Sequence, residues 1–117
     1  MPEITLYGTQ HCDPAKKARK WLDENSITHR FHDVRADGLD QDTLKRWINT
    51  AGWETVLNKR GTTWRKLDPA VQENVSASNV TELLLEHRAM IKRPVLDVNG
   101  SITIGFKADN YHEIFNS

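Results

Sequence analysis

The sequence predicts an α/β fold: a four-stranded mixed sheet flanked by helices, with an all-helical insertion in the middle of the chain. Residues 4–7 and 27–34 are rich in β-forming side chains and enclose a helical pattern, as in a parallel strand–helix–strand unit. Residues 95–104 form a hairpin pattern around an Asn-Gly pair, which suits a type I′ turn. Residues 37–91 lack a convincing strand, so this middle part is predicted to be helical.

The first helix is expected over about residues 13–25, after the break at Gly8. Asp13 is a plausible N-cap, and Pro14 suits the first helical position. The helix should bury the apolar residues that recur at helical spacing: Ala15, Ala18 and Leu22. Since a second strand follows, these elements predict a right-handed crossover.

The insertion is predicted to contain several helices. Asp40 should cap a helix with an apolar face formed by Leu44, Trp47, Ile48 and Ala51. Asn79 and Glu82 resemble a capping box at the start of a later helix. After the hairpin, the chain should end in a short helix over residues 108–115.

Composition limits the classes of function. A chain of 117 residues is long enough for one core, and we expect a single domain. The 16 Lys and Arg residues balance the 16 Asp and Glu residues, so charge gives no sign of a nucleic-acid or membrane partner. The sequence shows neither a signal-peptide pattern nor a membrane-spanning run. With one cysteine and no metal-ligand spacing, we expect a cytoplasmic monomer that holds no metal.

That cysteine, Cys12, stands where the first strand leads into the first helix. Unpaired N–H groups and the positive end of the helix dipole favour an anion there, and Lys16 and Lys17 add positive charge one turn later. These features predict a reactive thiolate. The alternative is a buried, inert cysteine that packs as a small apolar side chain.

Three motifs carry a resemblance to a known family. They are YGTQHCDPAKKARKWL at residues 7–22, NKRGTTWRKL at residues 58–67 and IKRPV at residues 91–95. In order and spacing they resemble the ArsC/Spx family, most closely its YffB-like branch, over essentially the whole chain. The resemblance implies a thioredoxin-like fold built from residues 1–36 and 92–117, with residues 37–91 as the helical insertion.

The resemblance also implies roles for particular residues. Cys12 would be the nucleophile, Arg60 and Arg93 would line its pocket, and the bond between Arg93 and Pro94 would be cis, beside the sulfur. Arginine suits this role because its rigid, permanently charged fork matches an oxyanion. The alternative for either arginine is a solvated surface charge.

Further substrate contacts are expected from Thr9, His11, Lys16 and Lys107. Thr9 offers a hydroxyl from the loop before Cys12, and Lys16 could hold a glutathione carboxylate or simply be solvated. His11 could assist the thiol or be exposed without a role. Lys107 stands where related arsenate reductases carry a third arginine, and it would supply the charge without the fork.

Two positions depart from the family pattern. Ala15 stands where redox-switch members carry a second cysteine, and Gly8 stands where typical arsenate reductases carry a histidine. Since a local disulfide is impossible, turnover would need an external thiol.

The sequence therefore predicts an oxidoreductase of the arsenate-reductase type, with no bound cofactor and with glutathione as co-substrate. Its partners would be glutathione or glutaredoxin and a small oxyanion or disulfide substrate. The alternative is a regulator like Spx, which would contact RNA polymerase without catalysis.

Overall fold

The computed structural model describes residues 3–116, and these divide into two compact units. The first unit contains the residues up to Asp37 and those from Arg93 onward. The second unit is Gly38–Lys92. Each unit has its own buried apolar side chains, and each is described separately below.

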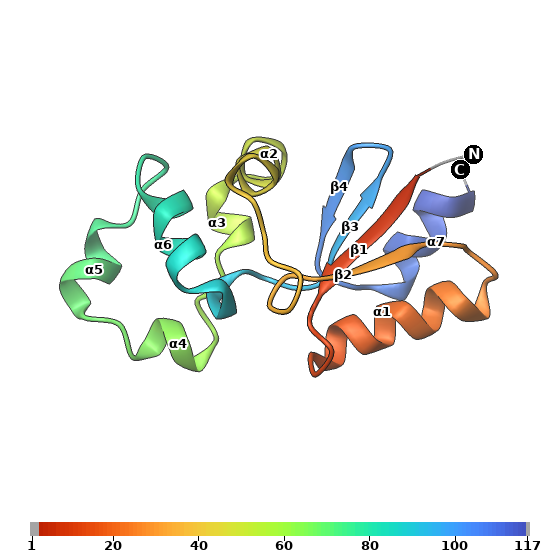
Figure 1. Cartoon of the computed structure of the whole chain (residues 1–117), viewed down its shortest axis with the longest axis horizontal. Coiled ribbons are helices and arrows are strands. Elements are labelled where there is room, and N and C mark those ends of the chain that lie inside the picture. Colours follow the sequence, from red (N-terminus) through yellow and green to blue (C-terminus); the bar gives the residue numbers. More distant parts are fainter. Residues whose placement is uncertain (1–2, 117) are drawn as a thin grey trace. The chain divides into compact units, whose positions relative to one another are not determined.

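The first unit contains a four-stranded mixed sheet (Figure 1). Its strands are β1 (Ile4–Gly8), β2 (Arg30–Asp33), β3 (Val95–Val98) and β4 (Ser101–Ile104), in the order β2-β1-β3-β4. β1 is parallel to β2 and antiparallel to β3, and β3 is antiparallel to β4. The predicted α/β fold with a four-stranded mixed sheet is confirmed.

One face of this sheet is covered by α1 (Asp13–Glu24) and α7 (Ala108–Asn116). The buried cluster joins both helices to alternate residues of the strands: Ile4, Leu6, Leu96, Ala18, Leu22 and Tyr111. Alternation explains the choice of residues, because every second side chain of a strand points to the same face. The apolar positions predicted for the first helix, Ala15 among them, are all fully buried.

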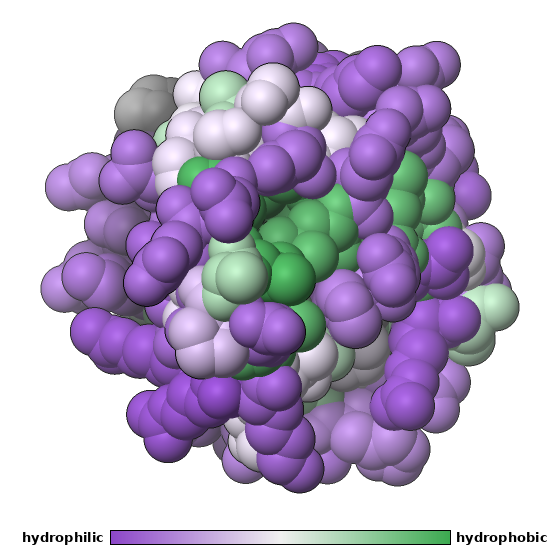
Figure 2. Space-filling view, turned by 90° about the vertical axis from the view of Figure 1, so that its left-hand side faces the viewer, coloured by the Kyte–Doolittle hydropathy of each residue, from purple (hydrophilic) through white to green (hydrophobic). Residues whose placement is uncertain are grey.

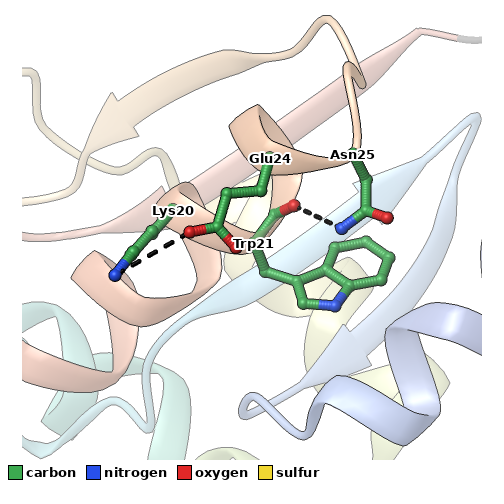
Figure 3. Close-up of polar contacts among 4 residues, drawn as sticks. All are labelled: Lys20, Trp21, Glu24 and Asn25. Carbon is green, nitrogen blue, oxygen red and sulfur yellow. Dashed lines mark hydrogen bonds and ion pairs between the residues drawn. The ribbon is translucent and has the colours of Figure 1, made fainter.

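After the C-terminal end of α1, the chain turns back toward β2 (Figure 3). The side-chain amide of Asn25 donates to the Trp21 carbonyl oxygen at 2.8 Å, and Lys20 pairs with Glu24 at 3.8 Å. Ser26 then has a positive φ of 56°, and the backbone N–H of Ile27 donates to the Leu22 oxygen at 2.9 Å. The N–H of Ile27 is therefore bonded to α1 and not to the sheet, and β2 covers only part of the strand predicted over residues 27–34.

The hairpin between β3 and β4 turns at Asn99 and Gly100. Both residues have positive φ, 54° and 91°, which agrees with the predicted type I′ turn. The N–H of Gly100 donates to the Asp97 carboxylate at 2.7 Å and fixes the turn. Asn99 also accepts a hydrogen bond from the N–H of Glu3, so the hairpin holds the start of β1.

The second unit is helical, as predicted for the insertion. Its helices are α2 (Gln41–Ala51), α3 (Trp53–Val56), α4 (Thr62–Arg65), α5 (Pro69–Asn74) and α6 (Val80–Glu86), with the short 3-10 helix η1 (Arg88–Met90). Its β structure, within the described residues, is one isolated bridge between Leu57 and Ile91. The predicted N-cap Asp40 is confirmed, because its carboxylate accepts from the Thr43 N–H at 2.7 Å.

Two capping predictions were wrong. The N-cap of α1 is Cys12, and Asp13 is already helical. Asn79 is the N-cap residue of α6, as predicted, but the capping box is not formed, because the Asn79 side chain makes no capping bond. Its side chain instead accepts from the Ser76 N–H at 2.8 Å and donates to the Asn74 oxygen at 2.8 Å. An Asn side chain bonds readily to nearby backbone, and here it bonds to the turn that precedes α6 and not to the first turn of the helix.

Candidate active site

Cys12 is the residue at which α1 begins. Its backbone is extended, with φ −84° and ψ 116°, and its carbonyl oxygen accepts the first helical bond, from Lys16 at 2.9 Å. Its own N–H donates to the Thr9 oxygen at 3.2 Å, which closes a tight turn over Gln10 and His11. Cys12 is partly exposed, and its side chain forms no capping bond within the described residues. It is thus closer to the helix terminus than the sequence indicated.

The close approach of α1 to β1 depends on Gly8. A Cβ atom at this position would lie 2.8 Å from the Cβ of Ala15, a separation that real Cβ atoms essentially never show. Ala15 is fully buried three residues after Cys12. The two residues that depart from the family pattern therefore touch one another. Together they let the helix that carries Cys12 lie directly against the sheet.

Arg93 and Pro94 reach the same loop from the other side of β1. The register pairs Tyr7 with Val95, the first residue of β3. Arg93 and Pro94, which directly precede β3, therefore lie beside the end of β1. The Arg93-Pro94 peptide bond is cis, as the resemblance implied, and Pro94 is buried. The guanidinium of Arg93 donates to the Thr9 hydroxyl in a long contact of 3.4 Å. Two predicted site residues are thus brought together at the cysteine loop.

Lys107 follows the end of the hairpin. The N–H of Gly105 donates to the Pro94 oxygen at 2.8 Å, so the chain leaves β4 next to the cis bond. Lys107 is exposed two residues later, and its carbonyl oxygen accepts from the Tyr111 N–H as α7 starts. The backbone of Lys107 therefore lies close in the chain to the contact with Pro94, and its positive charge is on an exposed side chain.

His11 and Lys16 are both exposed. His11 precedes Cys12 in the turn, and Lys16 lies in the first turns of α1. Their roles in binding remain predictions.

Arg60 belongs to the second unit. It is exposed in the turn before α4, where its backbone N–H donates to the Asn58 side chain at 3.0 Å. The N–H of Asn58 in turn donates to the Met90 oxygen at 2.7 Å, so the turn is attached to η1. The role of Arg60 beside Cys12 stays a prediction.

Asp33 is a residue that the sequence analysis did not select. It ends β2, is only 7% exposed, and its carboxylate accepts three backbone N–H bonds: from Arg35 at 2.8 Å, Ala36 at 3.0 Å and Gln10 at 3.3 Å. The bond from Ala36 holds the pKa of Asp33 below its usual value, although burial opposes this, and the bonds from Arg35 and Gln10 lower it further. The sequence signal that could have pointed to Asp33 is an acidic residue at the end of a strand that runs parallel to the strand before Cys12.

Residues 3–116 include no group of three or more His, Cys, Asp or Glu side chains placed to hold a metal ion. Nor does any helix in this part of the chain combine the length and apolar character needed to span a bilayer.

The sheet order, with the cysteine at the N-terminus of α1 and the proline before β3, is that of a thioredoxin-like fold. Comparison with protein families makes the assignment more specific. The model of the ArsC family matches residues 7–114, and the chain belongs to this family.

Among solved structures, a protein named YffB is 47% identical, with a TM-score of 0.90 over 94% of this chain and 96% of its own. An arsenate reductase (ArsC) related protein from Brucella melitensis is 44% identical, with a TM-score of 0.78 over 98% of this chain and 96% of its own. The global transcriptional regulator Spx of Streptococcus mutans is 28% identical over 91% of this chain and 78% of its own length. The chain is thus similar both to an arsenate-reductase-related protein and to a transcriptional regulator.

Proposed function

We propose that this protein is a glutathione-dependent reductase in which Cys12 is the single catalytic thiol. The observation that carries the proposal is the position of Cys12, a partly exposed residue, as the N-cap of α1. Free N–H groups of the first turn and the helix dipole favour an anion at that point, and a thiolate is the nucleophilic form of cysteine. Membership of the ArsC family supports the same chemistry.

On a disulfide substrate the reaction would take two exchange steps. The Cys12 thiolate attacks the glutathionyl sulfur of a mixed disulfide, forms a Cys12–glutathione disulfide and releases the other thiolate, which takes up a proton. A glutathione thiolate then attacks the glutathionyl sulfur and releases glutathione disulfide and the Cys12 thiolate. Because Cys12 is the only cysteine in the chain, this second thiol comes from outside, as glutathione or glutaredoxin.

On arsenate the same thiolate would form a sulfur–arsenic bond and displace one oxygen as water. Glutathione then attacks the Cys12 sulfur, the sulfur–arsenic bond breaks, and its electron pair leaves with arsenic as arsenite. Cys12 remains as a mixed disulfide with glutathione, and a second glutathione restores it. The net change is the reduction of arsenate to arsenite with oxidation of two glutathione molecules to their disulfide.

The remaining predicted residues would bind the anionic substrate. We assign the guanidinium groups of Arg93 and Arg60 to the substrate oxyanion, because charge-assisted forked bonds hold such groups best. The contact between Arg93 and the Thr9 hydroxyl supports the assignment of both to one site. Pro94, His11, Lys16 and Lys107 would complete the surroundings of the substrate and of glutathione.

A coupled assay tests the proposal. The purified protein is supplied with glutathione, glutathione reductase and NADPH, and either hydroxyethyl disulfide or arsenate, and NADPH oxidation is followed. We expect turnover with at least one substrate and its loss to background in Cys12→Ser. Equal turnover by wild type and Cys12→Ser would refute the proposal.

The arginine assignments need a separate comparison. Arg93→Lys and Arg60→Lys keep the charge and remove the fork, so each should lower kcat/KM for arsenate about tenfold, the value of one charge-assisted bond. Arg30→Lys is the matched control, because Arg30 is exposed on β2. An arginine whose lysine variant behaves like this control would not bind the substrate.

One observation favours a second candidate function, binding to a protein partner like the Spx regulators. A groove of about 200 Å³ lies between α5 and α6, lined by Val71, Val75, Asn79, Glu82, Leu83 and Glu86. Val71, 40% exposed, is the one exposed large hydrophobic side chain among the described residues. Figure 2 shows apolar surface in a hollow ringed by polar side chains on this side of the molecule. Exposed apolar surface with a polar rim is typical of protein contacts.

Purified RNA polymerase distinguishes the two functions. A regulator would bind the polymerase equally well as wild type and as Cys12→Ser, and Val71→Asp would weaken this binding. Turnover without binding to the polymerase would support the reductase function and exclude the regulator function.

A further inference from the structure

We infer that Asp33 is a positioning residue for Cys12: its buried carboxylate fixes the loop that presents the thiol. The part of this inference that concerns substrate turnover rests on the proposed function. The part that concerns the geometry and reactivity of Cys12 does not.

The inference begins with the two parallel strands. β1 and β2 are in register from Thr5 with Arg30 to Gly8 with Asp33, and the N–H of Val34 donates to the Gly8 oxygen at 2.9 Å. Both strands therefore end at the same edge of the sheet. The cysteine loop follows β1 at this edge, and Asp33 is the last residue of β2.

Asp33 is held rigidly in its own turn. Its N–H donates to the Asp37 carboxylate at 3.1 Å, and its carbonyl oxygen accepts from the Asp37 N–H at 2.8 Å. One carboxylate oxygen accepts from the N–H groups of Arg35 and Ala36. The other oxygen accepts from the N–H of Gln10, which lies 23 residues away in sequence. The carboxylate is thus shared between a fixed turn and the cysteine loop.

The bond to Gln10 completes the support of the loop. Gln10 lies within the turn that the bond from the Cys12 N–H to the Thr9 oxygen closes, and Arg93 contacts the Thr9 side chain. Asp33 is therefore the buried charged group that bonds to the loop backbone between Thr9 and Cys12. Without this bond the turn before Cys12 loses a support, and the thiol is free to take other orientations relative to the first turn of α1, whose dipole favours a thiolate.

Asp33→Asn is the informative variant, because it keeps the shape and leaves one acceptor oxygen. If that oxygen retains the two shorter bonds from Arg35 and Ala36, the amide NH₂ faces the N–H of Gln10, and two donors cannot bond. Asp97→Asn is the matched control, since Asp97 accepts a backbone N–H in the hairpin turn of the same unit.

The first readout is amide hydrogen exchange of Gln10 by NMR. We expect exchange in Asp33→Asn to be about tenfold faster than in wild type, as befits the loss of one bond to a charged acceptor. The second readout is the rate of Cys12 alkylation by iodoacetamide, which should fall about two- to fivefold, the stabilisation that a helix N-terminus gives to a well-placed anion. Because the variant also removes a negative charge, which by itself would favour the thiolate and speed alkylation, a fall reports the loss of loop geometry. Asp97→Asn should change neither rate. Unchanged exchange at Gln10, or alkylation as fast as in wild type, would overturn the inference.

Wild-type protein provides a test that does not depend on a folded variant. The Gln10 amide should exchange more slowly than in an unstructured peptide of the same sequence, and absence of protection would overturn the inference. Neither readout requires turnover. If Cys12→Ser retains full reductase activity, the proposed function fails while the role of Asp33 in the loop stands.

Discussion

Replacing Gly8 with alanine should force α1 away from the sheet. The added Cβ would lie 2.8 Å from the Cβ of Ala15, whereas ordinary contact begins at 3.4 Å, so the gap must open by 3.4 − 2.8 = 0.6 Å. Both atoms are attached directly to backbone, and rotation of a side chain cannot relieve the contact. Overpacking of this kind costs about 1–3 kcal/mol of unfolding free energy. For a domain of this size that corresponds to a fall in Tm of about 4–12 °C.

A double-mutant cycle isolates this contact. Ala15→Gly alone should cost about 1 kcal/mol through helix propensity, and it removes the atom with which the new Cβ collides. In the Ala15→Gly background, Gly8→Ala should therefore cost almost nothing. Chemical denaturation of the four proteins measures both costs. If Gly8→Ala is equally costly in the two backgrounds, or costs nothing in the wild type, the reasoning about this contact is wrong.

Three further predictions concern single side chains. Thr9→Val removes the acceptor of Arg93 and should raise KM for arsenate about threefold, the effect of one modest hydrogen bond, without lowering Tm; an unchanged KM would argue against a role for this contact. The buried hydroxyl of Tyr111 has no hydrogen-bond partner among the described residues, and burial raises the pKa of Tyr111. Tyr111→Phe should therefore leave stability unchanged or raise it by about 1 kcal/mol in urea unfolding, and a clear loss would show that the hydroxyl is bonded. The pKa of Asp33 is depressed in the folded protein, so its stabilising effect is complete above the ordinary value of 3.8 and is lost as pH falls through the folded pKa. The difference in unfolding free energy between wild type and Asp33→Asn should accordingly shrink below pH 3.8, and a constant difference down to acid pH would contradict this role.

Local patterns in the sequence were sufficient for most of the fold. The Asn-Gly pair between two short strand-like runs predicted the hairpin and its turn, because this signal depends only on neighbouring residues. The buried face of α1 followed from helical spacing for the same reason. Caps were less predictable, since several residues near a helix end can accept the same N–H. Asn79 bonded to the preceding turn, and Cys12 took the position expected for Asp13.

The candidate site was predictable only in part. Cys12, Arg93 and Pro94 carry motif signals, and the register of β1 with β3 places the last two beside the cysteine loop. Asp33 was missed because its importance depends on a bond to Gln10, 23 residues away, across the ends of two strands. No local pattern reports such a contact. The same reason explains why Gly8 was recognised as a departure from the family, while its contact with Ala15 was not predicted.

The most direct test of the reductase account is the intact mass of the protein after incubation with glutathione disulfide. The account predicts that wild type gains a single glutathionyl group on Cys12, that excess glutathione removes it, and that Cys12→Ser gains none. If native wild-type protein gains no such group, or holds it without release to glutathione, Cys12 does not perform the proposed exchange.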